Sequence, residues 1–527
     1  MATPGDQFGT PTVPGILVSS EVLQAGDATG GHRVLLIGLS IPERVADPKT
    51  NRVVDVGSQA EVDRLFGVGG QLSRMYRRYR QNDPTTPVSV FGVGYGATRG
   101  AATGNLSTAL TYATNATSAG TFVLYLFGSR FEIPVSEADT PATVAAATVL
   151  RVNARPSAGF LASAAGGVVT LRRRMMSQAS STLFPLEYFT NSERSHAWLD
   201  DSPTIIDDRP GGMTATLAIA DTASPGHGFA ATQLITAMGE RRFDSIVYPN
   251  GVAAEISAIQ TELDSRWGFR RQLYGHLWLA QAAATFGGIA RNAENHRHTT
   301  VLTYPADRML SPDDEVAAAC AGAAMASLTR DPAAPPAGIG GLLVAGLTLS
   351  PGEMYSRAQQ TVVTDFGWTT MFRGPDGRAR LTRVVSTATQ SPDGATDRSW
   401  RDVSTGFSVA AVNDAFVAVL RQFQGWKLAR DGARLGADQR ILTPQTIIQY
   451  LIAAHRGLED RGIVQNTDGF AASIRASIAA DAPGQLNIRC QIELVSGLYV
   501  ITLANRFSYS AFPQVAGAAR EGVTVNA

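Results

Sequence analysis

The chain has 527 residues, of which 45 are basic and 45 acidic, so its formal net charge is zero. This length implies about three or four domains rather than one compact core. The balanced charge excludes a strong field that would attract nucleic acid or an anionic membrane. Charged residues make up only 17% of the chain, and such a weakly charged surface is typical of a subunit that neighbours cover.

The first ten residues have neither the basic start nor the apolar core of a secretion signal. No apolar run approaches the ~20 residues needed to span a bilayer. We therefore expect a protein that folds in a cytoplasm, without membrane insertion. Residues 1–30 contain several prolines and glycines around one short strand, Ile16 to Val18 with Leu17 between them, and this composition predicts an extended arm.

From Arg33 the pattern becomes α/β. The run "RVLLIGLS", 33–40, is almost continuously apolar, as expected for a strand buried on both faces. Two helices follow, and "PVSVFGVG", 87–94, is the next strand. In the second helix we expect one buried stripe and one mostly solvated basic face. The stripe is Leu72, Met75, Tyr76 and Tyr79; the basic face is Arg74, Arg77, Arg78 and Arg80.

Residues 103–210 change character and predict an inserted β-rich domain. A hairpin spans 120–136, and a helix follows with Thr140 as its N-cap and Pro141 in its first turn. The α/β core thus occupies 31–102 and resumes at 211–384. A helix-rich domain follows at 385–497, and 498–527 form a terminal strand and tail. The predicted class is mixed α/β (α+β multidomain).

Two cysteines, Cys320 and Cys490, lie on apolar faces. Cys320 belongs to a predicted helix with an acidic first turn, which suits the helix dipole. Cys490 lies on a strand face with Leu486, Ile488, Ile492 and Leu494. Both are interpreted as small buried hydrophobic residues. A disulfide between subunits is the alternative.

The sequence contains no recognisable motif for catalysis, nucleotide binding or metal binding. The loop "GVGYGATRG", 92–100, lacks both the Walker lysine and the dinucleotide spacing, so its glycines are interpreted as turns. His296 and His298 have no metal-ligand partners and predict a solvated loop, whereas His276 predicts a core histidine. The aspartates of "DDSPTIIDD" predict a solvated acidic loop; they are Asp200, Asp201, Asp207 and Asp208. No catalytic, cofactor or metal site is expected.

Ordered segments along the whole chain resemble the Mu-type contractile-phage tail sheath family. They include "PGILVSSEVLQAG", "LFGVGGQLSRMYRRYRQNDPTTPVSVFGVG", "RFDSIVYPN", "LDSRWGFRRQLYGH" and "WKLARDGARLGADQRILTPQTIIQYLIAAHRGLEDRGIVQN". The resemblance implies stacked six-fold rings of identical subunits around a tail tube, which contract to drive the tube through the host envelope. It also implies a subtilisin-like domain, but the triad contexts G-T-S and H-G-T are missing, so the name describes fold only. Tube, baseplate and tail terminator proteins are the implied partners. The implied location is the virion tail sheath, assembled in the host cytoplasm.

The two ends of the chain are the segments expected to pair with neighbouring subunits. Alternation near the C-terminus predicts a half-buried strand, one face of which holds Tyr499, Ile501, Leu503, Phe507 and Tyr509. Family resemblance implies that this strand and Ile16–Val18 pair with sheets of neighbouring subunits. We expect contraction to start from a metastable extended state and to bury more surface; ~200 Å² per subunit would yield about 5 kcal/mol.

A second contact is expected on the predicted helix that ends near residue 462. Its polar end is a candidate for contact with the tube, through Arg456, Glu459, Asp460 and Arg461; an ordinary amphipathic helix is the alternative. Two other functions stay open from the sequence: the sheath of a non-viral contractile injection system, and an α/β nucleotide-binding enzyme.

Overall fold

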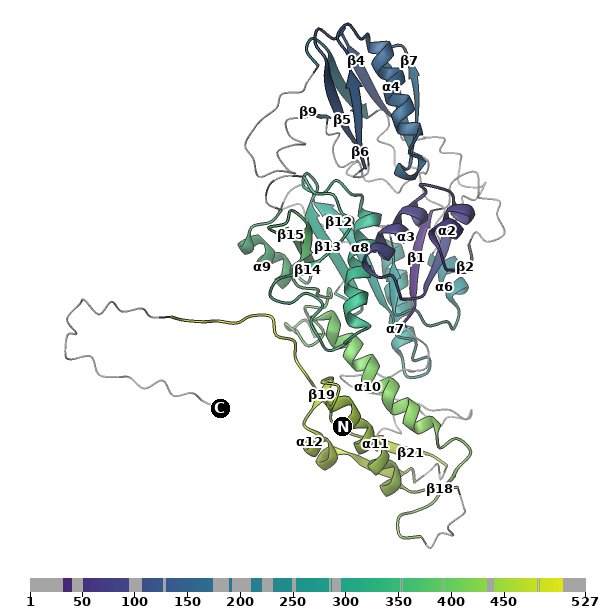
Figure 1. Cartoon of the computed structure of the whole chain (residues 1–527). Coiled ribbons are helices and arrows are strands. Elements are labelled where there is room, and N and C mark those ends of the chain that lie inside the picture. Colours follow the sequence, from purple (N-terminus) through teal and green to yellow (C-terminus); the bar gives the residue numbers. More distant parts are fainter. Residues whose placement is uncertain are drawn as a thin grey trace, which may run out of the picture.

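The computed structural model describes thirteen stretches and three isolated residues of the chain, which together cover most of the region between 32 and 505. The described residues are 32–39, 51–93, 107–126, 129–173, 189–191, 210–219, 231–248, 253–283, 286, 295–350, 352, 354–391, 393–433, 440–480, 482 and 484–505. In Figure 1 three regions follow one another along an elongated molecule: a β-rich region, a central sheet and a helical C-terminal region.

The central region is built on a nine-stranded mixed sheet in the order β14-β16-β15-β13-β12-β11-β1-β3-β2. The strands are β1 (Val34–Leu39), β2 (Val53–Val56), β3 (Val88–Val93), β11 (Ser245–Val247), β12 (His276–Ala283), β13 (Thr299–Pro305), β14 (Leu342–Leu343), β15 (Thr369–Arg373) and β16 (Ala379–Leu381). Neighbouring strands from β15 to β3 are parallel, whereas β2 and β16 run antiparallel to β3 and β15. The predicted α/β class is confirmed.

Helices cover both faces of this sheet. One face carries α2 (Gln59–Phe66), α3 (Gln71–Asn82) and α8 (Asp313–Leu328); the other carries α6 (Ala231–Met238), α7 (Ala253–Trp267) and α9 (Arg357–Asp365). In β1, Val34 and Leu36 belong to the first core and Leu35 and Ile37 to the second, and all four side chains are fully buried. The prediction of a strand buried on both faces is therefore confirmed.

The packing of α3 against α8 corrects one prediction. The apolar stripe of α3 is buried as expected, but Arg74 was expected to be solvated and is only 2% exposed. Its guanidinium lies 3.0 Å from Asp314 Oδ2 and 3.0 Å from Glu315 Oε1. Arg78, expected on the same solvated face, lies 2.5 Å from Glu315 Oε2 and is 17% exposed.

Arg74 and Arg78 are removed from solvent by a tertiary contact with α8. The acidic first turn of α8 is buried against α3, so its carboxylates need cationic partners rather than water. Burial raises the pKa of Asp314, and the nearby Arg74 opposes that rise. The charge pattern of α3 alone could not reveal a partner that is far away in the chain.

The β-rich region lies between β3 and α6 in the sequence. Its elements are β4 (Ser107–Ala113), β5 (Gly120–Leu126), β6 (Ser129–Val135), α4 (Pro141–Asn153), a 3-10 turn at Pro156–Ala158, β7 (Phe160–Ala165), β8 (Val168–Arg173), β9 (Phe189–Asn191) and β10 (Thr214–Ile219). They form a four-stranded and a three-stranded sheet around one core with α4. The hairpin and the Thr140 cap are as predicted. The inserted domain was predicted to end at residue 210, but β10 lies beyond that residue and still pairs with β4 of this region.

A close backbone contact joins the β-rich region to the central region. Gly69, which precedes α3 with a φ of +73°, approaches the turn at Pro156 so closely that an added Cβ would lie 2.1 Å from the Pro156 carbonyl oxygen. On the other side of the contact, a Cβ at Gly159 would lie 2.9 Å from the Gly69 carbonyl oxygen. Only glycine fits such a position, because it needs both positive φ and no side chain.

The C-terminal region is helical. Its elements are α10 (Val403–Arg421), β17 (Lys427–Leu428), β18 (Ile441–Leu442), α11 (Pro444–Glu459), β19 (Val464–Gln465), α12 (Thr467–Ser473), β20 (Arg475–Ile478), β21 (Leu486–Arg489) and β22 (Glu493–Leu494). Among the described helices, α10 alone is long and apolar enough to cross a membrane, and 61% of its apolar window is buried. Because its buried side chains contribute to the core of this region, α10 serves here as a core helix.

The single strand expected around Cys490 is divided in two. β21 pairs with β20 and β22 pairs with β19, and Cys490 lies between them. The predicted apolar face nevertheless holds, because its residues all pack against the C-terminal core: Leu486, Ile488, Cys490, Ile492 and Leu494. Cys320 is fully buried in α8, and both thiols are free.

Replacing Arg74 tests the buried network. We expect Arg74→Met to lower the free energy of unfolding by about 3–5 kcal/mol, because Asp314 loses its cation inside the protein. Denaturant unfolding monitored by circular dichroism measures the change. Arg77→Met on the same helix is the control and should change stability by less than ~0.5 kcal/mol. Equal effects of the two substitutions would contradict a special role for the buried network.

Candidate assembly surfaces

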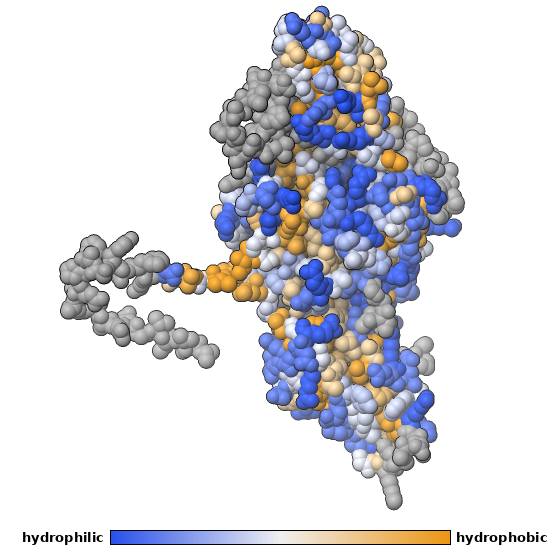
Figure 2. All heavy atoms as spheres, in the orientation of Figure 1, coloured by the Kyte–Doolittle hydropathy of each residue, from blue (hydrophilic) through white to orange (hydrophobic). Residues whose placement is uncertain are grey.

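The C-terminal segment is the most exposed apolar part of the described chain. Residues 495–505 form no strand with any described segment, although alternation predicted one. The exposed fraction is 60% for Leu498, 75% for Val500, 66% for Ile501 and 78% for Leu503. Figures 1 and 2 show this segment leaving the body as an extended, largely apolar ribbon. An exposed apolar segment of this kind is a candidate surface for contact with another chain.

Tyr499 differs from its neighbours. It is half-buried and lies under the guanidinium of Arg383, whose Cζ is 3.8 Å from the ring centroid. Burial and the nearby Asp402 raise the pKa of Tyr499 to about 12. Ile501 and Leu503 have no such contact and remain exposed. Of the other predicted pairing residues, Ile16, Leu17, Val18, Phe507 and Tyr509 lie outside the described residues.

Two-stranded ladders in the C-terminal region offer places where a foreign strand could add. β20 and β21 pair antiparallel with one another, from Arg475 opposite Arg489 to Ile478 opposite Leu486. Within the described part of the chain neither strand has a second partner. Each outer edge therefore retains backbone donors and acceptors that another strand can use.

The end of α11 carries the four candidate tube-contact residues. Arg456, Asp460 and Arg461 are exposed. Glu459 is half-buried and accepts a hydrogen bond from the backbone N–H of Thr467, the first residue of α12, at 3.3 Å. The side-chain hydroxyl of Thr467, together with this backbone bond, lowers the pKa of Glu459. Three of the four side chains are therefore available to a partner, and Glu459 also joins α11 to α12.

A known tail sheath protein is similar to this chain over most of its length. Over 484 residues, 92% of this chain and 94% of the relative, the chain is 23% identical to the Mu-like prophage FluMu tail sheath protein of Haemophilus influenzae. This chain is a homologue of a Mu-like prophage tail sheath protein. The resemblance predicted from the sequence is confirmed. No family model matches the chain.

Solved structures of sheath proteins are similar to a lesser degree. A sheath tail protein of Listeria innocua is 11% identical, with 89% of this chain and 93% of that chain covered and a TM-score of 0.45. One from Desulfitobacterium hafniense is 11% identical, with 93% and 99% covered and a TM-score of 0.47. The contracted sheath complex of an extracellular contractile injection system is 9% identical, with 95% and 98% covered and a TM-score of 0.42.

The histidine cluster of this sheath homologue corrects another prediction. His296 and His298 were expected in a solvated loop, but they are 9% and 1% exposed. The His298 ring stacks on Trp267 with 3.9 Å between centroids, and His296 Nδ1 lies 2.9 Å from the Thr299 hydroxyl. His276 is buried as expected and contacts Thr300 at 2.8 Å. The sequence could not predict this, because the covering residues come from α7 and from the loop that precedes α10.

Metal binding and phosphate binding find no support in the described residues. No group of three or more His, Cys, Asp or Glu side chains within them could hold a metal ion. The next described element after β3 is strand β4, so the described residues on either side of the glycine loop offer no helix N-terminus for a phosphate. Asp200, Asp201, Asp207, Asp208 and the glycines 94–100 lie outside the described residues.

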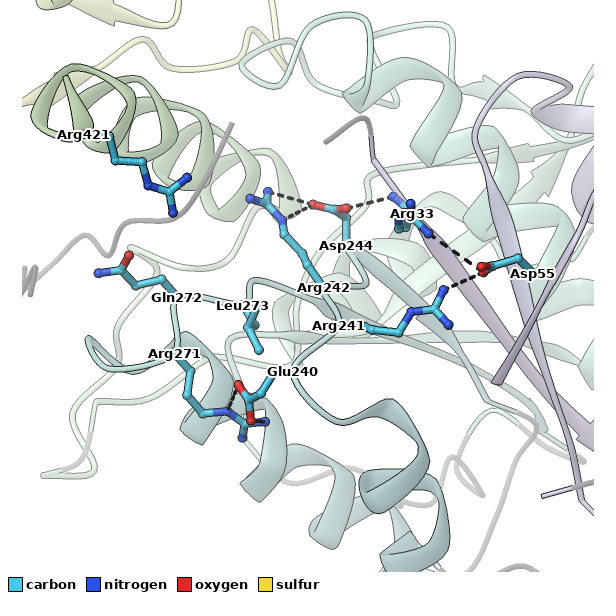
Figure 3. Close-up of a pocket in the computed structure, with 10 residues that line it drawn as sticks. All are labelled: Arg33, Asp55, Glu240, Arg241, Arg242, Asp244, Arg271, Gln272, Leu273 and Arg421. Atoms are coloured by element: carbon cyan, nitrogen blue, oxygen red, sulfur yellow. Dashed lines mark hydrogen bonds and ion pairs between the residues drawn. The ribbon is translucent and has the colours of Figure 1, made fainter. Parts of the chain in front are cut away.

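A hollow of about 500 Å³ lies beside the N-terminal ends of the parallel strands of the central sheet. It faces the C-terminal end of α10 (Figure 3). It is lined by Arg33, Asp55, Glu240, Arg241, Arg242, Asp244, Arg271, Gln272, Leu273 and Arg421. Its charged groups pair with one another: Arg242 contacts Asp244 at 2.8 Å and also Asp414 of α10 at 3.0 Å. Arg241 contacts Asp55 at 2.6 Å. This arrangement joins the central region to α10.

The buried histidines predict acid sensitivity. Burial, reinforced by the charge of His296, lowers the pKa of His276 to about 3, and burial lowers that of His298 well below its usual value. Between the unfolded pKa near 6.5 and the lower folded pKa, the unfolded chain binds more protons, so stability falls as pH falls. The expected loss is about 1.4 kcal/mol per pH unit for each histidine.

His298→Phe keeps a ring on Trp267 and removes the titration. We expect the stability difference between wild type and this variant to change with pH below 6.5 and to be constant above it. Denaturant unfolding from pH 4 to 8 measures it. Asp313, whose pKa burial raises to about 7, acts in the opposite direction and cancels in this difference. Parallel curves would show that folding does not lower the pKa of His298.

Proposed function

We propose that this protein is a structural subunit of a contractile phage tail sheath and that it works without catalysis or cofactor. The observation that carries the proposal is the set of exposed apolar side chains on the segment that extends away from the body of the subunit: Leu498, Val500, Ile501 and Leu503. Homology to a Mu-like prophage tail sheath protein over 92% of the chain supports it. Identical subunits would form stacked six-fold rings around a tail tube in a helical lattice. The tail is also where we expect the protein in the virion, after assembly in the host cytoplasm.

We further propose that neighbouring copies exchange their chain ends. Ile501 and Leu503 alternate along the segment, so both would face the core of an accepting sheet while Thr502 faces away. The free edges of β20 and β21 suit such a strand. Burying Ile501 and Leu503 would stabilise the joint by about 1.5–3 kcal/mol each. The parts of the arms that lie outside the described residues, Ile16 to Val18, Phe507 and Tyr509, belong to the same proposal.

The three regions have separate roles in this proposal. The central region, assigned to 31–102 and 211–384, would form the body of the lattice, and the β-rich insertion at 103–210 its outer surface. The C-terminal region, 385–497, would face the tube, and the arms, 1–30 and 498–527, would link copies. Baseplate and tail terminator proteins would bind the two ends of the sheath. A metastable extended lattice would contract because the contracted lattice buries more surface.

The arm proposal is tested by charge placed on one face of the segment. We expect the double substitution Ile501→Asp, Leu503→Asp to abolish tubes or sheets of the purified protein, because each carboxylate would be buried without a partner. Thr502→Asp, on the opposite face, is the control and should assemble. Negative-stain microscopy and sedimentation measure assembly. Normal tubes from the double variant would overturn strand exchange through this segment.

The tube contact is tested separately. We expect Arg456→Glu together with Arg461→Glu to weaken binding of the sheath to purified tubes at least about tenfold at low salt, through reversed charge. Sheath assembly without tube should be unchanged. Arg330→Glu, an exposed arginine after the end of α8, is the control. Unchanged co-sedimentation with tubes would place the tube contact elsewhere on the subunit.

A further inference from the structure

The place where the C-terminal segment leaves the body has a defined structure. Residues 500–505 are all exposed, whereas Tyr499 is half-buried with its ring 3.8 Å from the Arg383 guanidinium carbon. A cation this close to the face of an aromatic ring is attracted by the ring's quadrupole. Tyr499 is therefore the last described side chain of the segment that the body holds.

Arg383 is itself held in a fixed orientation. Its Nε and Nη2 donate to the two carboxylate oxygens of Asp402 at 2.7 and 2.8 Å, a bidentate pair. Asp402 is the N-cap residue of α10, and its backbone forms a β-bridge with Val385. The platform under Tyr499 is thus part of the joint between the central region and α10.

The residues before Tyr499 also approach the body closely. A Cβ at Gly497 would lie 3.2 Å from Pro335 and 3.2 Å from the Tyr499 ring. Glycine at this position lets the chain run against Pro335 and turn the ring onto Arg383. The contacts on both sides of Leu498 therefore restrict the direction in which the chain continues.

We propose that Tyr499, seated on the Arg383–Asp402 pair, is a positioning residue that sets the direction in which the C-terminal arm leaves the subunit. The inference rests on the proposed strand exchange and deepens it by separating two roles within the segment. Residues from Ile501 onward pair with the neighbour, while Tyr499 stays with its own subunit. An arm that starts from a fixed point searches a smaller volume, so strand exchange costs less conformational entropy. Because Asp402 begins α10, movement of α10 relative to the central region would also redirect the arm.

The first measurement uses the monomer, so it does not depend on assembly. In a Cys490→Ser background, spin labels at Thr361→Cys on α9 and Ala504→Cys on the arm report the distance between body and arm. We expect Tyr499→Ala to broaden this distance distribution, with about a tenfold larger undocked fraction. Tyr499→Phe keeps the ring over Arg383 and should give the wild-type distribution. Thr502→Ala is the control within the arm.

The second measurement uses assembly. We expect Tyr499→Ala to raise the critical concentration for tube formation several-fold, and Tyr499→Phe to restore it. If Tyr499→Ala leaves the monomer distances unchanged, or Tyr499→Phe broadens them equally, the positioning role is wrong. If the monomer distances broaden but neither Tyr499→Ala nor the Ile501→Asp, Leu503→Asp variant affects assembly, the positioning contact exists and the proposed strand exchange fails.

Discussion

The proposed assembly of the subunit depends on one feature, an apolar segment near the C-terminus that the subunit's own fold leaves exposed to water. Leu498, Val500, Ile501 and Leu503 are 60–78% exposed, and water solvates such side chains at a cost that association would remove. The central sheet shows the opposite arrangement, because Val34 to Ile37 of β1 are fully buried between two helical layers. The proposed association through this segment would bury the apolar side chains that the subunit itself leaves exposed.

The proposed strand exchange would link neighbouring subunits by a flexible joint, whereas the body of each subunit is held rigid by its internal contacts. The main-chain hydrogen bonds of an added strand depend little on sequence, so a joint of this kind can persist while the bodies it links rotate. Rotation performs work on a tube only if the bodies themselves do not deform. Three contacts oppose deformation: Arg74 between α3 and α8, Arg242 between the central region and α10, and the glycine contact between Gly69 and Gly159.

The sequence predicted what depends on local periodicity and missed what depends on distant partners. The buried strand from Val34, the Thr140 cap and the helix expected to end near residue 462 follow from short-range pattern and appear in the structure, the last as α11. Arg74 and His298 were misplaced because the groups that cover them come from other parts of the chain. Neither a charge pattern nor a histidine spacing contains that information. A buried acidic helix start, as at Asp314, is the one signal that could have suggested a buried arginine.

The C-terminal segment illustrates the same limit from the other direction. Alternation from Tyr499 to Leu503 predicted a strand, and the isolated subunit has none there, because a strand needs a partner to supply its hydrogen bonds. The alternating apolar pattern is typical of a strand in a sheet, and the described part of the single chain supplies no partner strand for it. Tyr499 is the exception within that pattern, since Arg383 provides for it inside the subunit. Under the proposed strand exchange, the change from the held Tyr499 to the exposed Val500 marks the boundary between the subunit's own fold and its contact with a neighbour.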